Sequence, residues 1–316
     1  MTSAIFKTFP GSLNSGFASY SLSVGPVKPG DSSNGVFPTE PPVNVSDIGT
    51  FWHAYNLFLA FGEKVCDAGG LSFGYLSNLG NDSYLLTSSV ILPGKDESQT
   101  SAFVAPLISS FQSIGINISD PTAFVVPYAS LGNGTGDVPF NTLFASRLFP
   151  RENWDDEALF NETTAVIREA VEAGLPFNGI NYAPTVTIAG YPGNNAVNPA
   201  FRKTLMHATV YAPGPITAQS PQDFLSRHAL LDTYMEKIRA VTPGAGAYIN
   251  EADVLEPNWQ QSFFGSNYPR LLEIKKAVDP WGLFWAPTTV GSEPWHVVTR
   301  DGLPTQNGPL CRTDLH

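Results

Sequence analysis

Hydrophobic residues recur along this chain at two spacings, one typical of helices and one typical of strands. Phe51, Tyr55 and Phe58 fall on one helical face of a segment over residues 50–65. Similar spacing predicts helices over residues 99–114, 155–173 and 224–241, and alternation predicts strands over 2–9, 17–24, 71–76, 84–92, 122–128, 185–189 and 205–211. Since helices and strands do not alternate strictly, the pattern favours an α+β fold, an antiparallel sheet covered by helices.

Local signals set the expected ends of these helices. Ser46 is the expected N-cap of the first helix, because its hydroxyl can accept a bond from a free backbone N–H. Pro106 lies inside the second helix and predicts a kink or a nearby start. Asp155 and Asp156 sit where the third helix begins, and the helix dipole favours acidic residues there.

The last quarter of the chain predicts a strand followed by two helices. The small residues 244–247 allow close approach of the backbone to another group. On a strand, Tyr248 and Asn250 would point to one face and Glu251 to the other. A short helix at Trp259 and a longer one carrying an apolar stripe follow, and the stripe consists of Leu271, Ile274 and Val278. Such a segment can close a core without any ligand.

Composition excludes several function classes. With 42% hydrophobic and 14% charged residues the 316-residue chain is expected to fold, and its net charge of −11 argues against nucleic-acid binding. No apolar stretch of about eighteen residues predicts a membrane span. The five histidines and two cysteines lack metal-ligand spacing, so no zinc or iron site is expected. Gly-x-Ser-x-Gly is absent, which does not support a serine hydrolase.

Low charge and many Gly, Pro, Asn, Ser and Thr residues suit an extracellular protein. Five Asn-x-Ser/Thr sequences agree with this, at Asn44, Asn81, Asn117, Asn133 and Asn161. Residues 1–10 nevertheless have neither the charged nor the apolar region of a signal peptide. Cys66 and Cys311 fit either a single bridge or two buried thiols.

Three motifs in order over about forty residues resemble the C-terminal segment of the berberine-bridge-enzyme-like FAD-linked oxidases of the vanillyl-alcohol-oxidase superfamily. They are Tyr-x-Asn-Glu-Ala-Asp from Tyr248, Trp…Phe-Phe-Gly-x-Asn-Tyr-x-Arg-Leu from Trp259, and Lys-x-x-x-Asp-Pro-x-x-Leu-Phe from Lys275. The following residues 290–295 and 302–312 look most like the secreted fungal branch that includes the isoamyl alcohol oxidase-like proteins.

The resemblance implies a domain order. Residues 1–10 would be the last strand of an FAD-binding domain, residues 11–242 the substrate-binding domain, and residues 243–316 a segment that returns to the FAD-binding domain. Neither the glycine-rich flavin loop nor the histidine motif for covalent attachment is found in the sequence. We therefore expect a truncated or excised part of a secreted parent, with a deliberately short paralogue as the alternative.

The resemblance also implies site residues. Tyr248 is the expected catalytic residue, and Tyr248 and Asn250 are expected to approach the isoalloxazine ring of FAD. Many family members have a second tyrosine after this asparagine, where this chain has Glu251, so the catalytic base is unassigned. Asn195, Asn198 and Arg202 match a family loop and are expected to bind substrate, although asparagines also cap turns.

The function that the resemblance implies is hydride transfer from an alcohol, sugar or secondary metabolite to flavin, with dioxygen as electron acceptor. The expected partners are therefore a small-molecule substrate, dioxygen and the missing FAD-binding domain. As an isolated chain the protein is expected to be inactive. The alternative is a non-catalytic secreted binding module or an inactive paralogue that holds carbohydrate or protein on its Asn-rich and aromatic surface.

Overall fold

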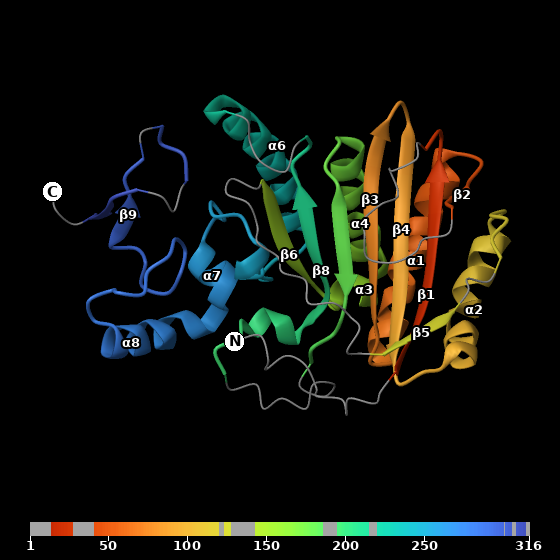
Figure 1. The fold of residues 1–316 in the computed structure, drawn as a ribbon, viewed down its shortest axis with the longest axis horizontal. Helices are drawn as coiled ribbons and strands as arrows, with labels where there is room; N and C mark the ends of the chain where they lie inside the picture. Colours follow the sequence, from red (N-terminus) through yellow and green to blue (C-terminus); the bar gives the residue numbers. More distant parts are fainter. Residues whose placement is uncertain are drawn as a thin grey trace.

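One sheet of eight strands runs through the molecule and carries helices on one of its faces (Figure 1). The computed structural model describes residues 14–27, 41–119, 123–127, 143–185, 195–214, 220–299, 301–304 and 308–313. The strands are β1 (Asn14–Val24), β2 (Val43–Asn44), β3 (Leu71–Gly80), β4 (Ser83–Pro93), β5 (Phe124–Pro127), β6 (Phe144–Pro150), β7 (Phe177–Asn181) and β8 (Thr204–Tyr211). Their order is β2-β1-β4-β3-β7-β8-β6, with β5 beside β1.

The expected α+β architecture is confirmed. The strand pairs are antiparallel, except that β1 and β2 run parallel. A two-residue turn at Asn81 and Asp82, both with positive φ, joins β3 to β4 as a hairpin. The predicted strand over residues 2–9 lies outside the described residues. The same holds for residues 186–189 of the strand predicted at 185–189, whereas Thr185 itself is not in a strand.

The helices that cover the sheet are α1 (Ile48–Asp67), α2 (Glu97–Ser113), α3 (Glu152–Asp155), α4 (Glu157–Glu172) and α6 (Pro221–Ala240). In α1 the predicted apolar face is buried, and Phe58 packs so closely on the sheet that a Cβ at Gly74 would lie 2.5 Å from its ring. Pro106 lies within α2 without ending it. None of the described helices is long and apolar enough to cross a bilayer.

Two helix starts differ from prediction. Asp47, and not Ser46, caps α1 by accepting a bond from the Thr50 N–H at 2.8 Å, because its carboxylate reaches the free backbone donor. The Ser46 hydroxyl instead donates to the Asp47 carboxylate. The helix predicted from 155 divides into α3 and α4, since Asp156 is extended (φ −111°, ψ 117°) and caps α4 at the Leu159 N–H.

The two faces of the sheet differ in their cover. Neighbouring residues of a strand point to opposite faces. Gly74 lies under Phe58 of α1, and the register places Ala208 on the same helix-covered face. His207 therefore points to the opposite face, together with Thr209 and Tyr211. We call this opposite face the open face.

The predicted strand over residues 244–251 is wrong. The backbone of this segment bonds to two different elements and to no single neighbouring strand. Leu148 N–H of β6 donates to Gly246 O at 2.8 Å, and Ala247 N–H donates to Ser262 O of α7 at 2.8 Å. A short 3-10 helix, η3 (Ile249–Glu251), follows. The predicted close approach is confirmed at Gly246, where a Cβ would lie 2.6 Å from both Asn198 Nδ2 and Ser262 O.

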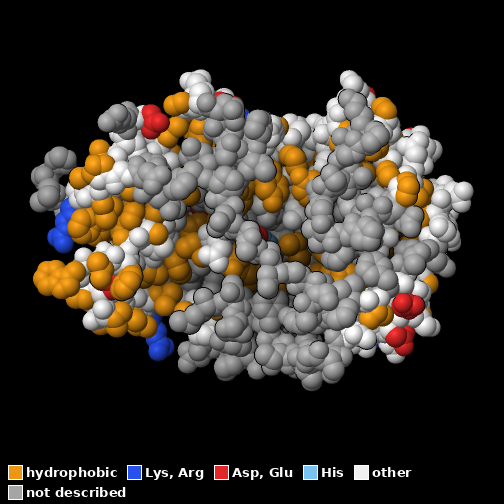
Figure 2. Space-filling view, viewed as in Figure 1, with side chains coloured by type: hydrophobic (Ala, Val, Ile, Leu, Met, Phe, Trp, Pro, Cys, Tyr) orange, Lys and Arg blue, Asp and Glu red, His pale blue; other side chains and the backbone are white. Residues whose placement is uncertain are grey.

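The two predicted C-terminal helices are present. They are α7 (Trp259–Phe264) and α8 (Tyr268–Val278), joined by the 3-10 helix η4 (Gly265–Asn267), and the hairpin of β9 (Trp295–Val297) and β10 (Leu310–Arg312) follows. No residue of α8 is buried, so its apolar stripe does not close a core. Large exposed side chains gather here, namely Ile274, Val278, Trp281, Leu283 and Phe284. We call these five residues the α8 surface, and Figure 2 shows hydrophobic side chains over the C-terminal elements on the left.

The two cysteines are free thiols and do not form the single bridge that the sequence left open. Cys66 is buried in α1 and its Sγ lies 3.8 Å from Leu205 O, and burial raises the pKa of this thiol to about 12. Cys311 is exposed on β10.

Candidate functional site

The ring of Tyr248 is held against the open face by three elements. Its backbone N–H donates to the Ser146 hydroxyl of β6 at 3.3 Å. Its ring meets Phe201 of η2 (Pro199–Arg202) and His207 of β8 edge-on, with centroid distances of 5.7 and 5.8 Å. These edge-to-face contacts favour the observed orientation of the Tyr248 ring.

Asn250 lies beside Tyr248, as predicted, although the strand that motivated the prediction is absent. The amide Nδ2 of Asn250 donates to the Tyr248 hydroxyl at 2.7 Å. The turn of η3 brings the two side chains together, since Glu251 N–H closes it on Tyr248 O at 2.9 Å. The catalytic role of Tyr248 and the cofactor contact of both residues stay predictions.

His207 completes this cluster and was not predicted. It is 3% exposed, and its Nε2 has no hydrogen-bond partner among the described residues. Burial lowers the pKa of His207 to about 4, so the imidazole is neutral near pH 7. An unbonded nitrogen in a buried neutral ring is costly, so a water molecule or a ligand is expected to bond it.

Glu251 lies beside His207, with 3.7 Å between its Oε2 and the histidine Nδ1. Strand geometry predicted that Glu251 would face away from the cluster, and the 3-10 turn overturns this. Burial raises the pKa of the Glu251 carboxyl. We call Tyr248, Asn250, Glu251 and His207 the reaction cluster.

Aromatic residues continue the open face beyond the cluster. Tyr211 lies 6.0 Å from Phe144 and 6.5 Å from Tyr75, measured between ring centroids. Burial raises the pKa of the Tyr75 and Tyr211 hydroxyls, so both remain protonated donors. The face therefore offers flat rings with hydroxyl groups to a planar partner.

The predicted substrate residues satisfy neighbouring backbone groups in this structure. Asn195 Oδ1 accepts from Val197 N–H at 2.8 Å. Asn198 is buried, donates to Ser262 O at 2.8 Å and caps η2. Arg202 Nη1 donates to Pro184 O at 2.9 Å. The loop thus positions Phe201 against Tyr248, and substrate binding by these three residues stays a prediction.

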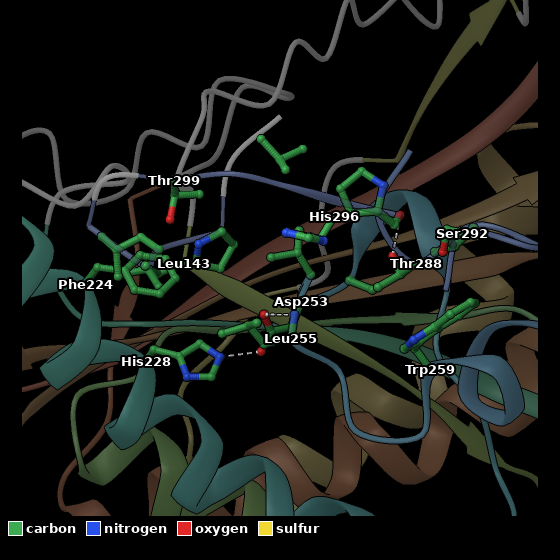
Figure 3. Close-up of a pocket in the computed structure, with 18 of the residues that line it drawn as sticks. Leu143, Phe224, His228, Asp253, Leu255, Trp259, Thr288, Ser292, His296 and Thr299 are labelled. Carbon is green, nitrogen blue, oxygen red and sulfur yellow. Dashed lines mark hydrogen bonds and ion pairs between the residues drawn. The ribbon is translucent and has the colours of Figure 1, made fainter. Parts of the chain in front are cut away.

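A large pocket lies next to the reaction cluster, between α6, the residues after η3 and residues 285–304 (Figure 3). Its volume is about 720 Å³, and Asn250 is one of its lining residues. At its wall His228 Nε2 lies 2.6 Å from Asp253 Oδ2, and this hydrogen bond raises the pKa of His228. The imidazole also stacks on Phe224, with 5.7 Å between centroids.

Other predicted sites have simpler outcomes. Among the described residues no three His, Cys, Asp or Glu side chains group as metal ligands. Asn44, Asn81, Asn117 and Asn161 are exposed, and Asn133 lies outside the described residues. Their glycosylation stays a prediction.

Known proteins resemble this chain over most of its length. Residues 247–291 match the family model described as berberine and berberine like. An FAD-linked oxidoreductase of Gibberella zeae, ZEB1, is 30% identical over 276 residues, which cover 84% of this chain and 45% of the relative. The VAO-type flavoprotein oxidase VAO615 of Thermothelomyces thermophilus is 31% identical over 281 residues, covering 85% of this chain and 46% of the relative.

Solved structures show the same fold. The crystal structure of the VAO-type flavoprotein MtVAO615 from Myceliophthora thermophila matches with a TM-score of 0.70 and 27% identity over 95% of this chain and 50% of that one. Berberine bridge enzyme from Eschscholzia californica, at 10% identity, shares the fold with a TM-score of 0.60. The chain spans about half the length of these relatives. By motif, sequence and fold, it is similar to the C-terminal part of the berberine-bridge-enzyme-like FAD-linked oxidoreductases of the VAO type.

Proposed function

We propose that this chain forms the substrate-side half of an FAD-dependent oxidoreductase, with the flavin ring against the open face of the sheet. The observation that carries the proposal is the buried, neutral His207, whose Nε2 has no partner among the described residues and whose ring contacts Tyr248. The names of the relatives, which are FAD-linked or VAO-type flavoproteins, support the choice of cofactor.

The residues present fit a flavin ring. An isoalloxazine is flat and has hydrogen-bonding atoms on one edge, and the cluster presents an aromatic ring with the paired groups of Tyr248 and Asn250. When bound, FAD would supply a hydride acceptor. In this proposal Tyr248 and Asn250 contact that ring, and the open face excludes water from one side of the substrate.

His207 would remove the proton of a substrate hydroxyl. Its lowered pKa of about 4 leaves the ring neutral near pH 7, and Nε2 can then accept a proton if Nδ1 carries the other. Nδ1 faces Glu251 at 3.7 Å, so this carboxylate would stabilise the imidazolium as it forms. Histidine thus takes the base role that the sequence left unassigned.

The proposed substrate is an alcohol, sugar or secondary metabolite, and the proposed electron acceptor is dioxygen. The word oxidase in the name of the T. thermophilus relative supports this acceptor. We also propose that the protein acts outside the cell. The four exposed asparagines of the described Asn-x-Ser/Thr sequences support that location.

The α8 surface suits contact with a flavin-binding partner domain. Trp281, Leu283 and Phe284 are 81%, 80% and 77% exposed, which is unusual for such large apolar side chains. The relatives are about twice as long as this chain, so a region of similar size is available in them. We propose that this region covers the α8 surface.

A chimera tests the proposal. The matching C-terminal part of the T. thermophilus relative is replaced by this chain, and flavin absorbance and peroxide formation are measured with a panel of alcohols and sugars. We expect a flavin-containing oxidase, and His207→Gln should lower kcat at least about 100-fold without loss of flavin. His53→Gln is the matched control, because His53 is exposed on α1.

Two results would count against the proposal. A His207→Gln chimera as fast as the parent removes His207 from the base role. A chimera that folds and binds flavin, but forms no peroxide and reduces no flavin with any alcohol or sugar, favours the binding-module alternative.

A further inference from the structure

We infer that the pocket beside the reaction cluster holds the bulky, apolar body of a neutral or cationic organic ligand and discriminates against anions. Three tryptophans line this pocket, Trp259, Trp285 and Trp295, and we call it the tryptophan pocket. The identification of the ligand as the substrate rests on the proposed function, but the binding itself does not.

The tryptophan pocket is built by elements that are far apart in sequence. Leu143 begins the β6 wall, α6 contributes Phe224 and Leu225, and the C-terminal hairpin contributes Trp295. Figure 3 shows the side chains of Leu143, Trp259 and His296 around one common space. A volume of about 720 Å³ is within the range of sites that enclose a small organic molecule.

The aromatic walls are fixed in place. Trp285 Nε1 donates to Ser292 O at 3.1 Å, and Trp259 lies edge-on to Tyr268 with 5.7 Å between ring centroids. The guanidinium of Arg312 stacks on Trp295, 4.8 Å from the ring centroid. Rigid rings of this kind bind apolar bodies at small entropic cost, and their faces attract cations.

Charge in the tryptophan pocket is predominantly negative. Among its described lining residues there are two carboxylates, Asp253 and Glu293, two histidines, His228 and His296, and no lysine or arginine. Asp253 is paired with His228, while Glu293 accepts bonds from Gln260 and Tyr268. Because Asp253 already balances the charge of His228, an anionic ligand would lose its hydration without gaining an unpaired cationic partner among the described lining residues, so it should bind poorly.

The tryptophan pocket and the reaction cluster share residues. Asn250 lines the pocket while its Nδ2 donates to the Tyr248 hydroxyl. Phe144 also lines it, and this ring lies 6.0 Å from Tyr211 on the open face. A ligand body in the pocket would therefore place an attached hydroxyl group toward the reaction cluster, which makes the pocket a determinant of substrate choice.

The test uses the purified chain without flavin and three ligands of equal size, namely adamantane-methanol, the protonated adamantane-methylamine and adamantane-carboxylate. These are optically silent, so tryptophan emission reports binding and calorimetry gives the Kd. We expect the alcohol and the ammonium to bind and the carboxylate to bind at least about tenfold more weakly.

Variants assign the binding to the tryptophan pocket. Trp295→Ala should weaken binding of the alcohol about tenfold or more, whereas Trp281→Ala should leave it unchanged, because Trp281 is 81% exposed and does not line the pocket. Leu225→Lys adds a cation at an exposed lining position on α6 and should improve carboxylate binding. Leu283→Lys is its matched control, exposed but not lining the pocket.

Equal binding of the carboxylate, equal loss in Trp281→Ala, or no binding of any ligand at millimolar concentration would overturn the inference. Leu225→Lys keeps the test decisive if Trp295→Ala fails to fold, since it replaces an exposed side chain. The oxidase proposal would fail with a different result, namely ligand binding by this chain together with an inactive chimera.

Discussion

His207 and His228 occupy opposite electrostatic environments. Burial without a hydrogen-bonded carboxylate lowers the pKa of His207 to about 4, whereas the hydrogen bond that His228 donates to Asp253 raises the pKa of His228. The first ring resists protonation and the second favours it. The two residues should therefore give the folded state opposite responses to pH.

His207 makes folding less favourable in acid. Its folded pKa lies below the ordinary value of 6.5, so its contribution is complete above pH 6.5 and is lost as the pH falls toward 4. Relative to His207→Gln, the wild type should lose on the order of 2 kcal/mol of unfolding free energy between pH 7.5 and 4.5. Urea unfolding at several pH values measures this. An equal loss in both proteins would refute it, and His53→Gln serves as the control.

Gly246 is required where the C-terminal segment crosses η2 and α7. A methyl group there would lie 2.6 Å from Asn198 Nδ2 and Ser262 O, and a backbone oxygen cannot rotate away. Gly246→Ala should cost about 1–3 kcal/mol in chemical unfolding. Gln261→Ala, exposed on α7, should change it by less than about 0.5 kcal/mol. Equal effects of the two substitutions would show that the structure accommodates a methyl group at position 246.

At this scale the sequence identified only part of the reaction cluster. The motif at Tyr248 and Asn250 predicted their adjacency correctly, since two residues two apart meet both on a strand and across a 3-10 turn. The sequence did not indicate His207, because its burial and its unbonded Nε2 depend on contacts with residues about 40 positions further along the chain. Alternation in β8 placed it on the same face as Thr209 and Tyr211, which was the available signal.

At the scale of elements, His228 and Asp253 join α6 to the residues that follow η3. Because the folded pKa of His228 is raised, its stabilising effect is complete below its ordinary value and is lost as the pH rises through the folded pKa. His228→Asn should therefore lower the thermal midpoint more at pH 5 than at pH 8. In the same variant, the rate of hydrogen exchange over residues 249–256 should increase. A pH-independent change would contradict the assigned pair.

Long periodic elements were predicted well, whereas irregular ones were not. The apolar face of α1 and the alternation of β1, β4 and β8 were strong signals of burial. The segment over residues 244–251 failed because its small residues permit many conformations, and the bonds to Leu148 and Ser262 that decide among them are tertiary. The N-cap of α1 differs from the prediction by one residue, because two neighbouring polar side chains, Ser46 and Asp47, could both accept from the same backbone donor.

For the whole molecule, we propose that the α8 surface contacts the flavin-binding partner domain. Phe284→Lys and Leu283→Lys should leave the thermal midpoint of the isolated chain unchanged, because both side chains are exposed. In the chimera the same changes should lower flavin content at least about tenfold. Lys276→Ala, exposed in the last turn of α8, is the control. Full flavin loading of the lysine variants would place the contact elsewhere.

The fold class was predictable because composition and mixed periodicity allow few layer arrangements. Domain boundaries at residues 10 and 242 stay predictions. The location of the tryptophan pocket was not predictable. Its walls come from β6, α6 and the C-terminal hairpin, and no local sequence pattern indicates that these elements lie together.

The backbone contact between Gly246 and Leu148 has a consequence for the fate of the chain during folding. β6 is the last strand of the sheet, and such strands carry unpaired N–H and C=O groups that recruit other chains. The Gly246 carbonyl accepts a hydrogen bond from one of these groups, the Leu148 N–H, and the Tyr248 N–H donates to the Ser146 hydroxyl nearby. The residues that hold the proposed catalytic tyrosine thus also cover part of this edge, and they are synthesised later than the strand that they cover.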